Sequence, residues 1–119
     1  MAAQRSADPT TVLPLSPPVY HVLLALGDSS SHGYAIMQAF DALTGGAEHL
    51  LPGTLYATLA RMVESGLIEE TDAPDPEADA RRRYYRVTAW GRSVASAESE
   101  RMRRLLSVAE SVGLAGEQA

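Results

Sequence analysis

Apolar residues recur at helical spacing in two segments of the first half of the chain. The first segment follows Ser16, whose side chain can cap a helix, and it stops at Gly27. The second follows Ser29–Ser31, a run that offers further capping side chains, and it ends at Gly45-Gly46. The apolar positions are Val19, Val22, Leu23 and Leu26 in the first segment and Ile36, Phe40 and Leu43 in the second. This spacing predicts one amphipathic helix in each segment.

A third helix is predicted to begin with Pro52 at its first position and to end at Gly66. Its buried stripe is formed by Leu55, Leu59 and Met62. The outward face is then expected to carry Gly53, Thr54, Ala57, Thr58 and Arg61. Because Leu51 precedes Pro52, this helix lacks a side-chain cap, a contact typically worth about 1 kcal/mol.

Two short strands are predicted after the third helix. Leu67–Thr71 directly follows the glycine that ends the helix, and Tyr84–Val87 is rich in residues that favour strands. Residues 72–80 lie between them and contain two prolines and four acidic side chains, a composition typical of a mobile, turn-rich loop. The pair is therefore interpreted as a β-hairpin with a long tip.

A final helix is predicted from Thr88, which can cap it, to at least Val112. One face carries a heptad seam that Glu98 interrupts. The seam consists of Ala95, Met102, Leu105, Ala109 and Val112. This spacing is typical of a helix that packs against a parallel or antiparallel partner, so we predict that these residues form a dimer interface.

The predicted order is three helices, a β-hairpin and a closing helix, which is a mainly α fold of the winged helix-turn-helix type. Residues 1–15 are expected to be a flexible arm, because polar residues and prolines interrupt every short apolar group there. Residues 16–88 then form the winged helix domain, and residues 89–119 form a C-terminal dimerisation helix with a short tail. A chain of 119 residues is long enough for one such domain and too short for two.

The composition excludes several classes of function. Apolar residues make up 45% and charged residues 21%, as in average globular proteins, and no apolar run is long enough to cross a bilayer. The first residues lack the pattern of a secretory signal, so we expect a cytoplasmic protein. Cysteine is absent, and the three histidines lack metal-ligand spacing. Because no catalytic pair or phosphate-binding glycine loop is present either, we expect no enzyme activity, metal or cofactor.

The net charge of −5 argues at first against a nucleic-acid partner, because phosphate contacts come from Lys and Arg. The distribution of charge changes this interpretation. Four arginines, Arg81, Arg82, Arg83 and Arg86, lie within six positions and no acidic residue separates them. All ten basic residues are Arg, whose planar guanidinium suits phosphates and base edges. Basic charge is therefore concentrated at the second predicted strand.

Four short motifs in the chain resemble the PadR family of transcriptional regulators. They are His32-Gly33-Tyr34-x-Ile36, Gly53-Thr54-Leu55-Tyr56-x-x-Leu59, Gly66-Leu67-Ile68 and Arg82-Arg83-Tyr84-Tyr85-Arg86-Val87-Thr88-x-x-Gly91-Arg92. The resemblance covers about residues 17–113. It implies a homodimer, held by the C-terminal helices, that represses promoters and is commonly released by a small hydrophobic or aromatic effector. Because a single helix follows the wing, the chain is similar to the short subfamily.

The third helix supplies candidates for contact with an operator in double-stranded DNA. Thr54, Thr58 and Arg61 are expected on its outward face, where recognition helices meet base edges in the major groove. The alternative for these residues is a plain solvated face. Tyr56 lies at the edge of the buried stripe, where its hydroxyl can reach either a phosphate or a protein partner.

The hairpin supplies a second set of candidates. Arg82 and Arg83 can project from the wing toward the DNA backbone or the minor groove. The alternative is that the acidic side chains of the loop, Asp75, Glu77 and Asp79, fold back onto this run of charge. The sequence leaves both arrangements open.

Trp90 is the only tryptophan and lies near the start of the last helix. Its ring can stack on a planar effector, or it can pack against the wing or the first helix. The chain as a whole also has two interpretations. It is a sequence-specific DNA-binding regulator, or it is a winged-helix module that docks protein partners without a specific DNA target, which its negative charge favours. Salt dependence separates these, because binding to DNA weakens steeply as salt rises.

Overall fold

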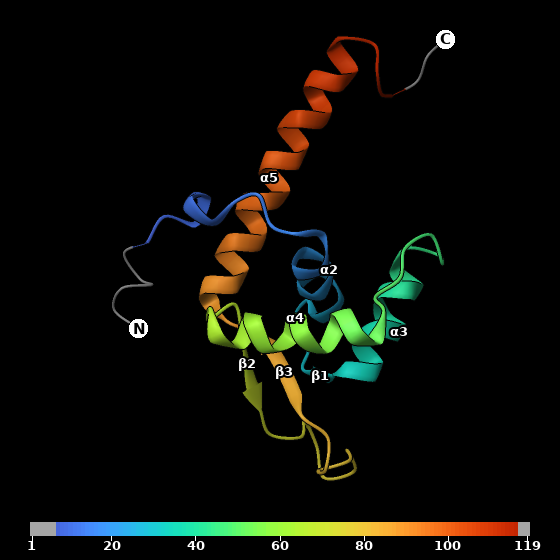
Figure 1. The fold of residues 1–119 in the computed structure, drawn as a ribbon, viewed down its shortest axis with the longest axis vertical. Helices are drawn as coiled ribbons and strands as arrows, with labels where there is room; N and C mark the ends of the chain where they lie inside the picture. The colour runs from blue at the N-terminus through green and yellow to red at the C-terminus, as the bar shows by residue number, and fades with distance from the viewer. Residues whose placement is uncertain (1–6, 117–119) are drawn as a thin grey trace.

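The computed structural model of the chain describes residues 7–116. The elements in chain order are η1 (Pro9–Val12), α2 (Pro17–Leu26), β1 (Ser31–His32), α3 (Gly33–Leu43), α4 (Pro52–Glu64), β2 (Ile68–Thr71), β3 (Tyr84–Val87) and α5 (Ala89–Ser111). Figure 1 shows α4 lying across the domain, the wing of β2 and β3 extending from one end, and α5 projecting from the other. This order confirms the predicted mainly α fold of the winged-helix type. Within the described residues, no helix has both the length and the apolar character needed to span a membrane.

The core lies between α2, α3 and α4, and the sheet and the first turns of α5 close it. Its most deeply buried apolar side chains are Val22, Leu26, Ile36, Phe40, Leu55, Leu59, Met62, Ile68 and Val94. The imidazole of His21 stacks on the Phe40 ring, with 4.2 Å between the ring centroids. Each large apolar side chain buried in this way contributes about 1.5 to 3 kcal/mol to folding. The three helices are thereby held in a fixed arrangement that presents α4 on the surface (Figure 1).

The sheet has three antiparallel strands in the order β1-β3-β2, one more than the predicted hairpin. In the hairpin, Ile68 pairs with Val87 and Thr71 pairs with Tyr84. The additional strand is the two-residue β1, in which His32 pairs with Tyr84. A strand of two residues has no period that a sequence pattern could reveal, and only its pairing with β3 defines it. The wing is therefore anchored to the start of α3 as well as to the end of α4.

Two of the predicted helix caps differ in the structure. Ser16 is the residue before α2, but its side chain makes no capping hydrogen bond. The cap of α3 is not one of the three serines but His32, whose Nδ1 accepts a hydrogen bond of 3.3 Å from the backbone N–H of Ala35. Pairing of β1 with β3 occupies Ser31 and brings His32 to the capping position. Leu51, as expected, gives α4 no side-chain cap.

The segment before α2 is more ordered than a flexible arm. Pro9–Val12 forms a turn of 3-10 helix, capped by Asp8, whose side chain accepts from the N–H of Thr10. Leu15 packs against the core, and its backbone N–H donates to Glu98 Oε2 on α5 at 3.0 Å. A contact between positions so distant in sequence leaves no local pattern. The part of the predicted arm before residue 7 lies outside the described residues.

The last helix, α5, spans both the domain and the space beyond it (Figure 1). Its first turns bury Gly91, Val94 and Glu98 against the domain. Gly91 packs directly on the backbone of Leu67, since a Cβ atom at this glycine would meet the Leu67 carbonyl oxygen at an impossible 2.0 Å. The remaining turns extend away from the domain, and the molecule is 53 Å long in its greatest dimension.

Candidate nucleic-acid interface

The exposed face of α4 has a centre of short side chains and two different edges. A helix turns about 100° per residue, which places Gly53, Ala57 and Ala60 in the middle of the face, followed on the same line by the exposed Glu64 in the last turn. Tyr56 lies at one edge, and Thr54 and Arg61 lie at the other. Short side chains let another molecule approach the helix backbone closely. The geometry therefore suits insertion of α4 into a groove.

Thr58 is not part of this face, contrary to the prediction that it points outward. Its side chain is 0% exposed, and its Oγ1 has no hydrogen-bond partner in the described part of the chain. The reason is helical spacing, because Thr58 is three residues after Leu55 and four before Met62, both of which are buried. It cannot contact DNA, and its role is to fill the core beneath the exposed face.

Arg61 is exposed and makes no ion pair. Every other arginine among residues 7–116 lies within 4 Å of a carboxylate, so Arg61 has the only unpaired guanidinium in that range. It borders a hollow that Val19 of α2 also lines, on the side of α4 away from the wing. A free guanidinium on a helix of short side chains is well placed to form a new hydrogen-bonded contact.

Tyr56 lies over the start of α3. A Cβ atom at Gly33 would come within 2.7 Å of Cε1 of the Tyr56 ring, so a larger residue at this position would displace the ring. The tyrosine is nevertheless 55% exposed, and its hydroxyl makes no hydrogen bond to another described residue. The ring thus packs against protein while the hydroxyl remains available, which combines the two roles that the sequence left open.

The arginines of the wing are paired with acidic side chains. Arg86 Nε lies 2.7 Å from Glu69 Oε2 across the hairpin, and Arg83 lies 3.8 Å from Glu70. Such exposed pairs contribute little to stability, so they separate readily when a stronger anion approaches. Of the three acidic loop residues that the sequence suggested could fold back, Asp79 forms ion pairs and the other two form none with a described residue.

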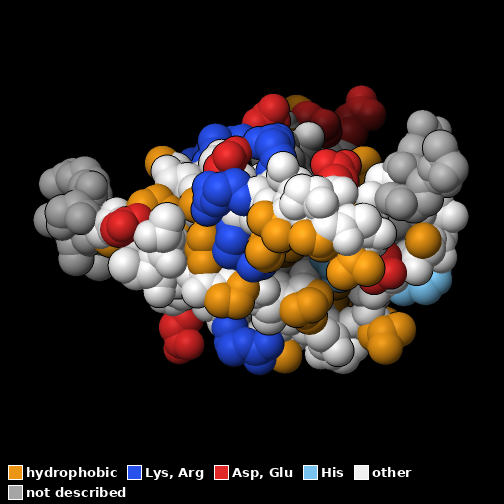
Figure 2. Space-filling model, turned by 90° about the horizontal axis from the view of Figure 1, so that it is seen from above, with side chains coloured by type: hydrophobic (Ala, Val, Ile, Leu, Met, Phe, Trp, Pro, Cys, Tyr) orange, Lys and Arg blue, Asp and Glu red, His pale blue; other side chains and the backbone are white. Residues whose placement is uncertain are grey.

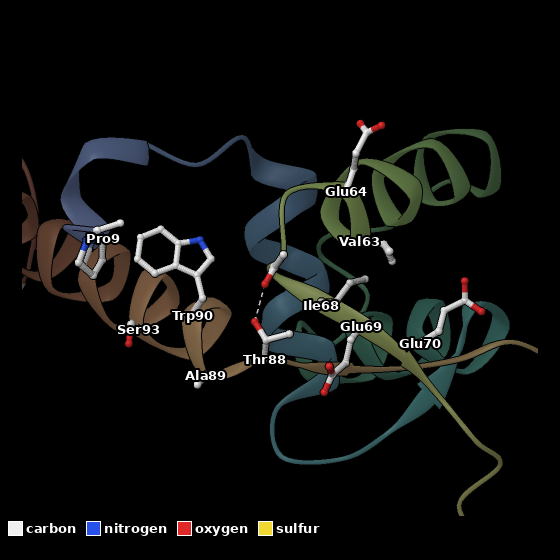
Figure 3. Close-up of a pocket in the computed structure, with 12 residues that line it drawn as sticks. Pro9, Val63, Glu64, Ile68, Glu69, Glu70, Thr88, Ala89, Trp90 and Ser93 are labelled. Carbon is white, nitrogen blue, oxygen red and sulfur yellow. Dashed lines mark hydrogen bonds between the residues drawn. The ribbon is translucent and has the colours of Figure 1, made fainter. Parts of the chain in front are cut away.

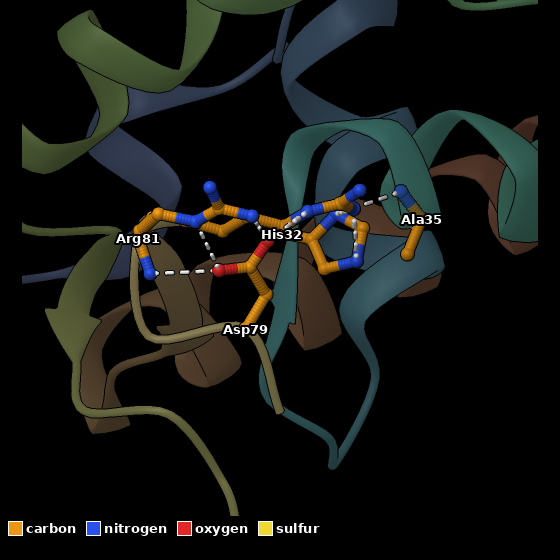
Figure 4. A network of polar contacts seen from close by, with 5 residues as sticks. His32, Ala35, Asp79 and Arg81 are labelled. Atoms are coloured by element: carbon orange, nitrogen blue, oxygen red, sulfur yellow. Dashed lines mark hydrogen bonds and ion pairs between the residues drawn. The ribbon is translucent and has the colours of Figure 1, made fainter. Parts of the chain in front are cut away.

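Asp79 connects the wing to α3 through a polar network, shown in Figure 4. Its carboxylate accepts from Arg81 Nε at 3.1 Å and lies 3.6 Å from Arg82 Nε. Arg82 Nη1 in turn lies 2.8 Å from both ring nitrogens of His32. Burial first, and then the positive charge of Arg82, lower the pKa of the His32 imidazole, although Asp79 opposes this. A neutral imidazole has one acceptor nitrogen, so Nδ1 accepts from both the Ala35 N–H and the Arg82 guanidinium, and the network holds the wing beside α3.

A cavity of about 570 Å³ lies between the start of α3, the middle of α4 and the wing. Its lining includes His32, Gly33, Tyr34, Tyr56, Arg82 and Arg83. The structure thus brings three predicted DNA-contact residues, Tyr56, Arg82 and Arg83, to one place, while Arg61 lies at the opposite edge of α4. Tyr34, which is 55% exposed, was not a predicted contact residue. Its only signal in the sequence is its position in the His32-Gly33-Tyr34 motif.

The predicted dimer seam divides into two parts. Ala95 packs against the core of its own chain, so it is not free to contact a partner helix. Met102, Leu105 and Val112 are exposed, and the latter two have 56% and 62% of their surface accessible. Leu106 and Val108 are exposed as well and widen the apolar face beyond the predicted seam. Viewed from this end of the molecule, hydrophobic side chains lie open beside arginines (Figure 2).

Trp90 is half-buried and packs against the edge of the core. In Figure 3 its indole lies beside Pro9 of η1, above the first turn of α5. The ring also borders a cavity that is lined by the end of α4 and by β2. The Trp90 ring therefore packs against protein on one side and also borders a cavity.

A sequence profile described as the transcriptional regulator PadR-like family matches residues 22–97, from within α2 to within α5. The chain belongs to this family. The description of this family is that of transcriptional regulators. The matched range contains α4, the wing and the cavity between them, but not the exposed apolar face at the end of α5.

The chain is also similar in sequence or in fold to several known proteins. An uncharacterized 37.1 kDa protein in transposon TN4556 of Streptomyces fradiae is 37% identical over 84 residues, which cover 71% of the chain and 22% of that protein. The chain thus spans about a fifth of the length of this relative. A PadR family transcription regulator from Clostridium difficile R20291 has the same fold, with 23% identity and a TM-score of 0.69 over 82% of the chain and 98% of that structure. A complex of RosR from H. salinarum, hsRosR-S4, matches with 25% identity and a TM-score of 0.66 over 83% and 81%.

Proposed function

We propose that this PadR-like regulator is a homodimeric repressor that binds a promoter operator in double-stranded DNA through α4 and the wing. The observation that carries the proposal is Arg61, whose guanidinium is unpaired on the exposed face of α4. Gly53, Ala57 and Ala60 beside it leave room for the floor of a major groove. In this proposal Arg61 and Thr54 contact base edges and so supply sequence specificity.

The cavity between α4 and the wing would hold the DNA backbone. A phosphate placed there can accept from the hydroxyl of Tyr56 and from the guanidinium groups of Arg82 and Arg83. These arginines exchange their carboxylate partners, Asp79 and Glu70, for phosphate oxygens. Phosphate contacts carry no base information, so this side of the interface supplies affinity and orientation.

The dimer interface is proposed to be the exposed apolar face of α5. Met102, Leu105, Ala109 and Val112 continue the same helix face that Val94 and Glu98 bury within the chain. A row of large apolar side chains on a projecting helix is costly in water, and a second copy of the same helix would cover it symmetrically. Two copies would then present two α4 helices to successive turns of an operator.

DNA recognition is tested on a duplex that the protein itself selects. The protein is mixed with a pool of random duplexes that also contains the DNA upstream of its own gene, and the duplex that it enriches is used in the binding assay. Fluorescence anisotropy should show that Arg61→Ala weakens binding to this duplex by about 1 to 3 kcal/mol, the usual value of one good base contact. Arg104→Ala is the matched control, because Arg104 lies on the projecting part of α5 and should leave DNA binding unchanged. Unaltered binding by Arg61→Ala would remove this residue from the interface.

Salt dependence tests the wing and the second candidate function together. Replacing Arg82 and Arg83 by Ala should weaken binding to specific and random duplexes alike and reduce the salt slope by about 2, one for each lost phosphate contact. If the chain is instead a protein-docking module that binds DNA only weakly, the DNA affinity of the unmodified protein should not depend steeply on salt concentration. The negative net charge of −5 favours that alternative, and a flat slope would establish it.

Repression and release are the finer parts of the proposal. We propose that binding at a promoter in the cytoplasm blocks transcription, and that a small aromatic or hydrophobic effector, contacted by Trp90, reverses the block. A reporter gene placed behind the enriched operator should be silenced when the protein is expressed. Increased expression of the reporter would instead identify an activator.

A further inference from the structure

The imidazole of His32 receives hydrogen bonds from two sides. Its Nδ1 accepts from the backbone N–H of Ala35 at 3.3 Å, and Arg82 Nη1 lies 2.8 Å from the same nitrogen (Figure 4). The Tyr84 ring of β3 lies nearly at right angles to the imidazole, with 5.5 Å between the ring centroids. Both hydrogen bonds use the lone pair of Nδ1, which the imidazole loses when it takes up a proton. The contact between the wing and α3 therefore depends on the protonation state of His32.

The charged groups around His32 come from the wing and its loop. Arg82 contacts the imidazole, and Arg83 lines the same cavity. The opposing negative charge is that of Asp79, which pairs with Arg81 and Arg82. The other titratable groups that line the cavity are Tyr34, Tyr56 and Tyr85. Burial and the charge of Arg82 lower the pKa of His32 below its ordinary value of 6.5, and Asp79 opposes this. In the absence of DNA, the neutral imidazole is therefore favoured.

A phosphate of the DNA backbone would reverse this balance. In the proposed complex, the guanidinium of Arg82 turns toward a phosphate oxygen in the cavity. The imidazole then has an anion beside it, and a nearby negative charge favours the protonated form of a histidine. A phosphate can accept from a protonated imidazole and from a guanidinium at the same time, whereas without the phosphate these two cations would repel each other.

We propose that His32 is a further ligand of the DNA backbone and that it contacts the phosphate in its protonated form, so that DNA binding takes up a proton. This inference rests on the proposed function, in which the cavity between α4 and the wing holds the backbone. Since phosphates carry no base information, the effect should be the same for specific and random duplexes.

The direction of the pH dependence follows from linkage between the two equilibria. The pKa of His32 lies below 6.5 in the free protein and is expected to rise when DNA binds. Between these two pKa values the affinity for DNA increases as the pH falls, by at most about tenfold per pH unit. Above both values the imidazole is neutral in either state, and the affinity no longer depends on it. Mildly acidic pH would therefore favour the DNA-bound state.

The affinity of the full-length protein is measured by fluorescence anisotropy at constant ionic strength, with the enriched duplex and with a random duplex. From about pH 8 to about pH 6, we expect the affinity for both duplexes to rise about fourfold to tenfold. His32→Asn should bind as the unmodified protein does at about pH 8 and show no such rise. Asparagine is a favoured helix cap that can accept from the Ala35 N–H, but it cannot take up a proton.

His49→Gln is the matched control. His49 is exposed and lies in the loop between α3 and α4, outside this cavity. The variant should keep the full pH dependence of the unmodified protein. Circular dichroism verifies that each variant is folded.

NMR of the imidazole nitrogens reports on the proton directly, and the chain has only three histidines to assign. We expect His32 to titrate below pH 6.5 in the free protein and above it in the complex. Arg82→Ala removes the neighbouring cation, so His32 should titrate at a higher pH in the free variant. The gain in DNA affinity between about pH 8 and about pH 6 should then be smaller. A histidine that only caps α3 would show neither change.

Three results would overturn the inference and leave the proposed function standing. The first is DNA affinity that is the same at both pH values. The second is pH dependence that persists in His32→Asn but disappears in His49→Gln, because the proton would then be taken up at His49. The third is a His32 titration that DNA does not shift, which decides the matter even if His32→Asn fails to fold. If the unmodified protein binds no duplex at any pH, the proposed function itself is wrong, and the inference with it.

Discussion

The two halves of α5 differ in what covers the same helix face. In the first half, Gly91, Val94 and Glu98 are buried against the domain. In the second half, Leu105 and Val112 continue this face at the same angular position and are more than half exposed. Both halves are amphipathic, but the first is covered by its own chain and nothing in the described chain covers the second. An apolar stripe therefore shows that a helix face needs a partner, and it does not say whether that partner belongs to the same molecule.

The boundary between the halves is a polar contact. Glu98 is 0% exposed although it is charged, and its carboxylate accepts from Arg101 Nε at 2.6 Å and from the backbone N–H of Leu15. The hydroxyl of Tyr20 lies 2.6 Å from that of Ser99 one residue further along. These contacts fix the start of the projecting half of α5 relative to α2 and the segment before α2. The direction in which the second half points is thereby set within one chain.

The largest effect is expected in the first half, from Gly91→Ala. The new Cβ atom would overlap the backbone carbonyl of Leu67, which cannot move without displacing β2, so we expect a loss of at least about 3 kcal/mol in unfolding free energy. Urea denaturation followed by circular dichroism measures this. Gly53→Ala is the matched control, because it is also a helical glycine and nothing lies within 4 Å of its Cβ position. That variant should be equally stable or up to about 1 kcal/mol more stable.

An intermediate effect is expected in the second half, from Leu105→Asp. The charge would be buried in the proposed dimer interface, and the dimer dissociation constant should rise roughly a hundredfold, equivalent to about 2 to 3 kcal/mol. Sedimentation at micromolar concentration measures the association. The domain itself should stay folded, because Leu105 is exposed within one chain. Ser107→Asp, on the polar side of the helix, serves as control. If the unmodified protein is a monomer, the proposed dimer is wrong, and the second half of α5 has no partner helix that covers it.

The smallest effect is expected at the boundary, from Glu98→Gln. Hydrogen bonds from Arg101 lower the pKa of the Glu98 carboxyl below its ordinary value of 4.5; burial opposes this, and the Leu15 N–H adds to it. A lowered pKa in the folded state means that the carboxylate stabilises the protein above pH 4.5 and that this contribution is lost as pH falls through the folded value. At neutral pH the substitution should cost about 1 to 2 kcal/mol.

Acid titration of stability provides the check on this last prediction. The unfolding free energy of the unmodified protein should decrease more steeply than that of Glu98→Gln as the pH is lowered below 4.5, so that the two curves converge. Parallel curves would show that Glu98 contributes no charge-dependent stability. The contact with Leu15 would then not hold the segment before α2 in place.

Local patterns predicted most of the elements and part of the candidate site. The prolines and glycines that begin or end helices, such as Pro52, were enough to predict α4. The β-favouring run Tyr84–Val87 was enough to predict β3. Gly33 and Tyr56, which lie in two of the motifs, pack closely against each other in the structure. The prediction was wrong at Thr58, because its polar side chain suggested an outward position although its spacing from Leu55 and Met62 places it on the buried side of α4.

The amphipathic face of α5, the basic run of the wing and the short side chains of α4 were determined by the sequence alone, because each depends on residues close together in the chain. Long-range contacts decided the rest. Pairing of β1 with β3 made His32 a helix cap and a partner of Arg82, and the packing of Leu15 on Glu98 ordered the segment before α2. Only the tertiary structure divided α5 into a covered and an uncovered half, because coverage depends on where other parts of the chain lie and not on the helix itself.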